Sequence, residues 1–132
     1  MPIGLTKDAG WQIGVSRTLP HPVALVWEFV SSAEGLALWL GPGTELTPER
    51  GAPYRTGQGV TGEVRGYRPR ERIRVTHGSG TVQVAMVPTG DGSRTVLRFH
   101  QDRMADAAER ERQRAHWKAV MDLVAAALDR AP

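Results

Sequence analysis

The chain has 132 residues, of which 40% are hydrophobic and 23% charged, a composition typical of a globular protein and of one domain, residues 1–132. Its 17 basic residues are offset by 14 acidic ones, so the formal charge is only +3 and the net field is modest. Because the chain has no cysteine, it excludes a disulfide framework, a thiolate nucleophile and any cysteine-ligated metal site.

The first predicted element is a strand over residues 11–19. Trp11, Ile13 and Val15 alternate there with glutamine, glycine and serine, which places them on one buried side. The N-terminal segment, MPIGLTKDAGWQIG, lacks the charged start and apolar run of a secretory signal, and no stretch approaches the roughly 18 apolar residues of a membrane span. We therefore expect a cytoplasmic protein without membrane insertion.

Two short helices are predicted next. Pro22 suits the first turn of one helix, and Ser31 with Glu34 stands at capping-box spacing for the other. The run Gly41-Pro42-Gly43 ends the second helix. The apolar stripe of the first helix is formed by Val23, Val26, Trp27 and Val30, and the second helix carries Leu36, Trp39 and Leu40.

From Thr44 to Gln101 short strand-like runs alternate with turn segments, which predicts about five or six antiparallel strands. After Asp102 the pattern becomes one long helix with a single apolar stripe, formed by Trp117, Val120, Met121, Val124 and Leu128. The expected fold is therefore α+β. A curved antiparallel sheet of about six or seven strands wraps the C-terminal helix, in the order strand, two helices, about six strands, helix. Such a sheet leaves room for a cavity against the helix.

The stretch VRGYRPRERIRV, residues 64–75, holds five arginines. Alternation places Ile73, Val75 and His77 on one face of its second strand and Arg72 with Arg74 on the other. Nucleic-acid surfaces usually add stacking aromatic residues or a recognition helix, which this segment lacks. The arginines are therefore interpreted as the solvated side of a hairpin, and no nucleic-acid partner is expected.

Four segments carry a family resemblance over residues 11–130: HPVALVWEFVSSAEGLALWLG, TGEVRGYRPRERIRVTH, TVQVAMVPTGDGSRTVLRFHQ and HWKAVMDLVAAAL. Together they resemble the START-like helix-grip superfamily (SRPBCC, Bet v 1-like), in particular bacterial proteins similar to the C-terminal domain of the activator of Hsp90 ATPase. The matching positions are Val26, Trp27, Trp39, Gly62, Val64, Pro69, Arg72, Ile73, Thr76, Gly90, Asp91, Gly92, His100 and Trp117. Two positions depart from the family pattern: His77 stands where the family often has tryptophan, and His116 replaces a glycine.

The sequence indicates no metal site, cofactor or serine triad. The four histidines, His21, His77, His100 and His116, lie far apart without ligand spacing, and no Gly-x-Ser-x-Gly elbow occurs. Catalytic residues therefore cannot be assigned. Simple alternation turns His100 away from the cavity, whereas the family resemblance favours the cavity mouth. For His77 a cavity-facing position and a half-solvated strand end are both open.

The candidate cavity lining combines large apolar side chains with a few polar groups. Each apolar member is equally interpretable as core. His77 and Gln101 are candidates to orient a ligand, with Arg98 as a further polar contact. The candidate ligand-binding residues are Trp39, His77, Met86, Phe99, Gln101, Trp117 and Met121.

Three functions remain open. The first is binding of a small hydrophobic molecule, such as a lipid-like ligand, in the cavity. The second, implied by the superfamily, is an enzyme of the polyketide cyclase or aromatase kind that uses His77 and Arg98. A chaperone cofactor ranks last, because 132 residues leave no room for the N-terminal domain that the Hsp90 activators carry. Homodimer formation is also open.

Overall fold

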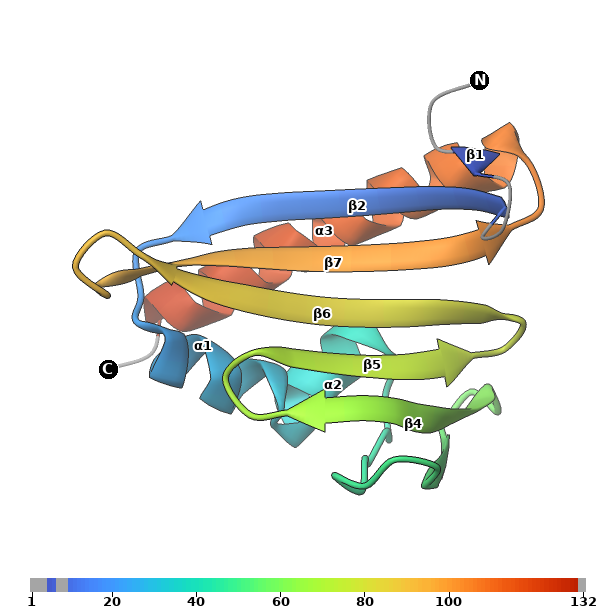
Figure 1. The fold of residues 1–132 in the computed structure, drawn as a ribbon, viewed down its shortest axis with the longest axis horizontal. Helices are drawn as coiled ribbons and strands as arrows, with labels where there is room; N and C mark the ends of the chain where they lie inside the picture. The colour runs from blue at the N-terminus through green and yellow to red at the C-terminus, as the bar shows by residue number, and fades with distance from the viewer. Residues whose placement is uncertain (1–4, 7–9, 131–132) are drawn as a thin grey trace.

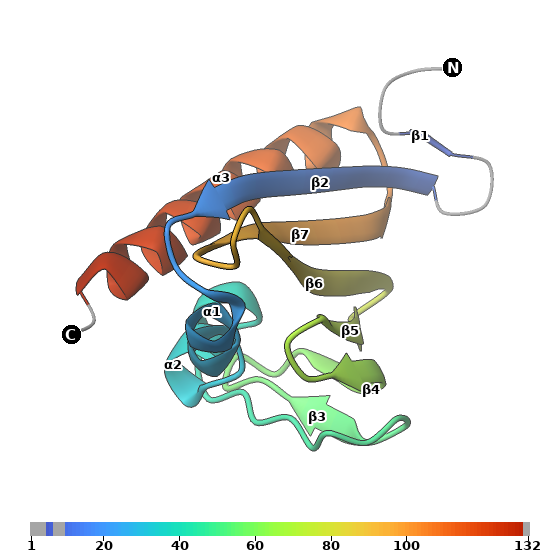
Figure 2. The same cartoon turned by 60° about the vertical axis from the view of Figure 1, so that its left-hand side comes forward.

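The computed structural model describes residues 5–6 and 10–130, and within them the chain forms seven strands and three helices (Figure 1; β3 is labelled in Figure 2). Residues 1–4, 7–9 and 131–132 of the predicted domain lie outside this description. The elements are β1 (Leu5–Thr6), β2 (Gly10–Leu19), α1 (Val23–Val30), α2 (Ala33–Trp39), β3 (Pro53–Arg55), β4 (Thr61–Arg68), β5 (Arg72–His77), β6 (Gly80–Thr89), β7 (Arg94–Met104) and α3 (Ala107–Arg130).

The strands form one antiparallel sheet in the order β1-β2-β7-β6-β5-β4-β3. All three helices lie on the same face of this sheet, with α3 crossing β2 and β7 and the α1–α2 pair beside it (Figure 1 and Figure 2). The predicted helix-grip architecture is confirmed. The distribution of strands differs from the predicted order: among the described residues two strands precede the helices and five follow them.

The core lies between the sheet and the helices, as the apolar patterns predict. Alternation along β5 buries Ile73 and Val75 completely, while Arg74 between them is exposed. On α3 the five residues of the predicted stripe are all buried, including Trp117 and Leu128 at 2% and 5% exposure. The long helix therefore packs against the sheet over most of its length.

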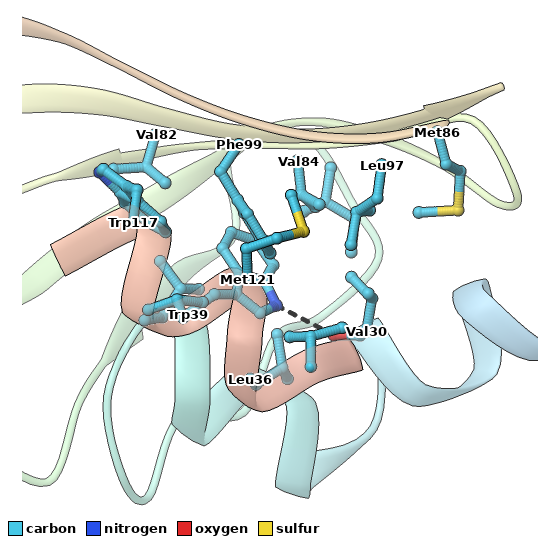
Figure 3. Packing of buried hydrophobic residues seen from close by; sticks show 14 of the residues in the cluster. Val30, Leu36, Trp39, Val82, Val84, Met86, Leu97, Phe99, Trp117 and Met121 are labelled. Atoms are coloured by element: carbon cyan, nitrogen blue, oxygen red, sulfur yellow. Dashed lines mark hydrogen bonds between the residues drawn. The ribbon is translucent and has the colours of Figure 1, made fainter. Parts of the chain in front are cut away.

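Aromatic rings fill the centre of this core. Phe99 of β7 stacks on Trp117, with ring centroids 5.2 Å apart, and lies 6.3 Å from the ring of Trp39. Trp39 also donates a 3.0 Å hydrogen bond from Nε1 to the carbonyl of Val30, which ties α2 to the end of α1 (Figure 3). Aromatic pairs at these separations add about 0.5–1.5 kcal/mol each beyond the burial of their surface.

The start of α2 differs from its prediction by one residue. Ser32, not Ser31, is the N-cap, and its Oγ accepts a 3.1 Å hydrogen bond from the amide of Gly35. Ser31 instead donates from Oγ to the carbonyl of Trp27, within the last turn of α1. Both serines stabilise the tight α1–α2 junction.

The end of β7 also differs, because the strand continues to Met104 and α3 begins only at Ala107. The register with β2 shifts by one residue between the pairs Ile13–Gln101 and Trp11–Met104. Arg103 occupies this irregularity in the left-handed region, with φ of 58°. The extra residue lets Gln101 and Met104 both face the helices.

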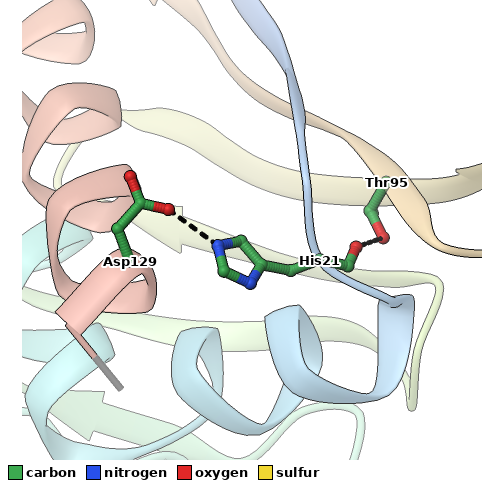
Figure 4. A network of polar contacts seen from close by, with 3 residues as sticks. All are labelled: His21, Thr95 and Asp129. Atoms are coloured by element: carbon green, nitrogen blue, oxygen red, sulfur yellow. Dashed lines mark hydrogen bonds and ion pairs between the residues drawn. The ribbon is translucent and has the colours of Figure 1, made fainter. Parts of the chain in front are cut away.

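Polar contacts join the C-terminal turn of α3 to the β2–α1 connection. Nε2 of His21 lies 2.8 Å from Oδ1 of Asp129, and the backbone carbonyl of His21 accepts a 2.8 Å hydrogen bond from Oγ1 of the buried Thr95 (Figure 4). Arg17 of β2 forms an ion pair with Asp122, which lies about two turns before Asp129 in α3. None of the helices among the described residues is long and apolar enough to span a bilayer.

Candidate functional site

A cavity of about 370 Å³ opens between the C-terminal end of α2, one end of the sheet and the first half of α3. We call it the α2–α3 cavity. Its volume lies within the range of small-molecule sites, which begins at about 300 Å³. It is lined by Ala37, Leu38, Trp39, Leu40, Gly41, Pro42, Gln58, His77, Val82, Gln101, Gln113, His116 and Trp117.

Four of the seven predicted ligand-binding residues meet at this cavity: Trp39, His77, Gln101 and Trp117. The other three, Met86, Phe99 and Met121, do not line it. They are at most 3% exposed and belong to the packed layer between sheet and helices (Figure 3). Their side chains fill the space that the curvature of the sheet creates, so free volume is left toward the open end near α2.

His77 is the last residue of β5, and its imidazole is held by Tyr54 of β3. Nδ1 of His77 lies 2.7 Å from the Tyr54 hydroxyl, and the two rings are stacked 11° from parallel. The same hydroxyl donates a 2.6 Å hydrogen bond to the carbonyl of Thr76. A phenol has one proton and a carbonyl has none to give, so the hydroxyl must accept from Nδ1–H. This arrangement leaves Nε2 as the unprotonated nitrogen.

Burial and charge keep the two cavity imidazoles neutral near pH 7. Burial lowers the pKa of His77, and the nearby imidazole of His116 lowers it further. The His116 ring packs edge-on against Trp117, with centroids 4.9 Å apart, and this partial burial lowers its pKa although the residue as a whole is exposed. A ligand entering the cavity would thus meet a lone pair on His77 rather than a positive charge.

Gln101 of β7 presents a donor to the cavity. Its Oε1 accepts two 2.8 Å hydrogen bonds, one from Nε2 of Gln113 and one from Nε1 of Trp117. These contacts orient the amide and occupy its oxygen, whereas its amide nitrogen has no hydrogen-bond partner among residues 10–130. The cavity therefore combines an acceptor, His77 Nε2, with a donor, Gln101 Nε2.

His100 and Arg98 lie on the opposite face of β7. His100 contacts Oε1 of Gln12 at 2.8 Å, and both His100 and Arg98 line a polar pocket on the outer face of the sheet. The alternation argument for His100 is confirmed, and the expectation of a cavity-mouth position is wrong. Arg98 does not face the α2–α3 cavity, since it alternates with the buried Phe99.

Sequence reasoning missed three contributors to the site: Tyr54, Gln113 and the cavity position of His116. On α3 the positions of Gln113 and His116 relative to Trp117, four residues and one residue earlier, place them on or beside the same helical face, so a helical-wheel argument could have found them. Tyr54 gives no such signal, because a three-residue strand carries too little pattern.

A second cavity, of about 380 Å³, lies between α1 and the C-terminal end of α3. It is lined by His21, Leu25, Glu28, Phe29, Ser32, Ala127 and Leu128. Its imidazole already faces Asp129, and the charge of Glu28 is poorly suited to an apolar guest. Within the described residues, no three histidine, aspartate or glutamate side chains gather closely enough to hold a metal ion.

Comparison with known proteins gives a family and a fold. A family model described as activator of Hsp90 ATPase homolog 1-like protein matches residues 20–129. Similar solved structures include MLL2253 from Mesorhizobium loti, with a TM-score of 0.78 and 19% identity over 92% of this chain and 98% of that one. DynU16, a protein from the dynemicin biosynthetic locus, has a TM-score of 0.71 and 25% identity, and the match covers 90% of this chain and 47% of DynU16.

The Aha1 dimer from Colwellia psychrerythraea shares the fold with a TM-score of 0.72 and 12% identity, over 89% of this chain and 95% of that one. No curated protein sequence matches the chain. At identities below 25% the structural likeness demonstrates the fold and leaves the ligand and activity open.

Proposed function

The chain belongs to the activator of Hsp90 ATPase homolog 1-like family, and we propose that it binds a small, largely apolar molecule in the α2–α3 cavity. The observation that carries this proposal is the combination of apolar side chains with polar side chains that hydrogen bonds hold in place. Leu38, Leu40 and Val82 supply apolar surface, while His77 and Gln101 supply one acceptor and one donor. Sites for small molecules commonly have this composition.

The polar groups favour a neutral ligand. The cavity lining contains no carboxylate, lysine or arginine. An uncharged imidazole and an amide pair well with a carbonyl or hydroxyl group, whereas an ion would enter without a counter-charge. We infer a neutral molecule that carries one hydroxyl or carbonyl group beside a larger apolar part.

A neutral fluorescent probe, N-phenyl-1-naphthylamine, tests the proposal. Ala37→Phe places a ring in the α2–α3 cavity and is expected to abolish saturable probe binding. Ala119→Phe, on the exposed side of α3, is the matched control and is expected to bind as the parent does. Ala127→Phe blocks the cavity between α1 and α3. Binding that survives Ala37→Phe and is lost in Ala127→Phe would contradict the assignment.

An enzyme of the polyketide cyclase kind is the second candidate, favoured by the unprotonated Nε2 of His77. A neutral imidazole with a fixed tautomer can act as a general base toward an acidic C–H group of a bound polyketone. The likeness to DynU16 supports testing this chemistry. In a cyclisation assay, His77→Gln should abolish turnover and His100→Gln, on the outer face, should not. Equal rates in both variants would remove His77 from the mechanism.

Two macromolecular partners follow from the relatives rather than from the cavity. The family description names an Hsp90 activator, and one similar structure is a dimer. Sedimentation of the purified chain, alone and with an Hsp90-type chaperone, tests both partners: a monomer that does not co-sediment would exclude both at the concentrations used.

A further inference from the structure

Arginine side chains surround a second, unassigned hollow on the outer face of the sheet. This basic pocket has a volume of about 370 Å³ and lies on the side opposite to the helices, near the turn between β5 and β6. It is lined by Arg50, Arg65, Arg74, Thr76, Gly78, Ser79, Gly80, Thr81 and Arg103. The four guanidinium groups come from four different segments of the chain.

Positive charge in this pocket is poorly compensated. Arg65 pairs with Glu63, but Arg50, Arg74 and Arg103 form no ion pair or hydrogen bond through their side chains with any residue that the structure describes. No aspartate or glutamate lines the pocket itself. Like charges held around one volume repel one another, so an anion that enters would remove an unfavourable interaction as well as gain favourable ones.

The positive field extends along the sheet beyond the pocket. A smaller hollow of about 260 Å³ shares Arg74 and Thr81 with the basic pocket and adds Arg98 and His100. Burial lowers the pKa of His100, and the charge of Arg98 and, to a smaller extent, of Arg74 lowers it further, while the charge of Asp102 acts in the opposite direction. Asp102 is the carboxylate of this hollow; it is buried, and its Oδ1 accepts a hydrogen bond from the amide of Thr81.

Hydroxyl groups complete the donor set. Oγ1 of Thr76 accepts a 2.9 Å hydrogen bond from the amide of Glu63, so its own proton is free to point outward. Ser79 and Thr81 add further hydroxyls at the rim. Guanidinium groups bind phosphate and carboxylate oxygens through paired N–H donors, and hydroxyls add single donors.

From this geometry we infer that the basic pocket binds a small multivalent oxyanion, the diphosphate-like or polycarboxylate part of a small molecule. The number of guanidinium groups favours more than one negative charge on the ligand, and the size of the pocket favours a compact group. Stacking aromatic residues, which single-stranded nucleic acids require, are missing from its lining. This site is separate from the α2–α3 cavity and does not depend on the function proposed for it.

Amide chemical-shift titrations test the inference, with inorganic pyrophosphate and tricarballylate as probes at low ionic strength. The expected result is saturable binding, with the largest shifts at Thr76, Ser79, Thr81 and Arg103. The tighter of the two probes identifies the oxyanion as phosphate or carboxylate. Binding should weaken as salt is added, because exposed charges are screened.

Charge-matched variants decide whether the pocket is specific. Arg74→Gln with Arg103→Gln removes two exposed guanidinium groups from the pocket and should weaken binding by about tenfold or more. Arg112→Gln with Arg114→Gln removes the same charge from the exposed surface of α3 and should leave Kd nearly unchanged. Unchanged melting temperatures show that both variants are folded.

Three results would overturn the inference. Equal weakening in both double variants, or no saturation by either probe, would mean that the pocket contributes only net charge. Much tighter binding of a single-stranded DNA oligonucleotide, with shifts spread along β2 and β7 beyond the pocket, would mean that this face is a nucleic-acid surface.

Discussion

Replacing Tyr54 by phenylalanine removes the hydroxyl that joins His77 to the backbone of β5. The variant loses a 2.6 Å hydrogen bond to the Thr76 carbonyl and a 2.7 Å contact with Nδ1 of His77. Each such bond contributes about 0.5–1.5 kcal/mol net, so the free energy of unfolding should fall by about 1–3 kcal/mol. Tyr54 is 6% exposed, and phenylalanine keeps its ring, so packing should change little.

Urea unfolding measures this loss, and Tyr67→Phe is the matched control. Tyr67 is the other tyrosine of the chain; its ring packs edge-on against Trp27, and its hydroxyl forms no hydrogen bond with the residues described. The control should change stability by no more than about 0.5 kcal/mol. Equal effects of the two substitutions would contradict the role assigned to the Tyr54 hydroxyl.

The same variant tests the tautomer of His77. Long-range proton–nitrogen NMR spectra of the imidazole should show the proton on Nδ1 in the parent protein and a loss of that preference in Tyr54→Phe. A parent protein with the proton on Nε2 would refute the reasoning, because the hydroxyl would then donate to histidine and leave the Thr76 carbonyl without its bond.

Three further predictions concern pH, close packing and helix capping. Burial lowers the pKa of His77, His100 and His116 in the folded state, so the unfolded chain binds more protons just below pH 6.5. The free energy of unfolding should therefore fall as the pH drops from about 7 to 5, and replacing two of these residues in His77→Gln with His116→Gln should make the fall smaller. Urea midpoints that rise over this pH range would contradict the expected sign. Gly62→Ala would place Cβ 2.0 Å from the Thr76 carbonyl oxygen and should lower the free energy of unfolding, measured by thermal unfolding, by about 2–3 kcal/mol. Gly66→Ala on the same strand meets nothing within 4 Å and should lower it by about 0.5 kcal/mol. Similar losses of stability in the two variants would show that β4 shifts to accommodate the new Cβ. Ser32→Ala removes the N-cap hydrogen bond of α2 and should lower the free energy of unfolding in urea by about 1 kcal/mol. An unchanged stability would mean that this hydrogen bond does not stabilise the helix.

Periodicity predicted most of the elements and the face that their regular parts turn toward the core. The stripe from Trp117 to Leu128 predicted the buried side of α3, and alternation placed His77 and His100 on opposite faces of the sheet. These properties are local, because they depend only on the direction of successive side chains. The irregular end of β7 gives no such signal, since Arg103 takes a positive φ without the glycine that usually marks it.

The depth of a residue within the layer could not be predicted from one sequence. Phe99 and Gln101 lie on the same face of β7, yet Phe99 is enclosed between Trp39 and Trp117, while Gln101 reaches the cavity. Whether free volume remains beside a side chain depends on how three helices fill the concave side of the sheet, which is a property of packing. The same reason explains why Met86 and Met121 proved to be core.

The last two residues of β5 point to opposite faces of the sheet, and each contributes to a chemically different surface. His77 faces the α2–α3 cavity, whereas the side chain of Thr76 faces the basic pocket and its carbonyl accepts from Tyr54 on the other side. Consecutive residues of a strand point to opposite faces, so adjacent positions can serve an apolar guest and an oxyanion without sharing a side chain. Substitutions of His77 and of Arg74 should therefore affect the two binding reactions independently. A probe bound in the cavity that changed the affinity for pyrophosphate would instead mean that the Tyr54–Thr76 hydrogen bond couples the two faces.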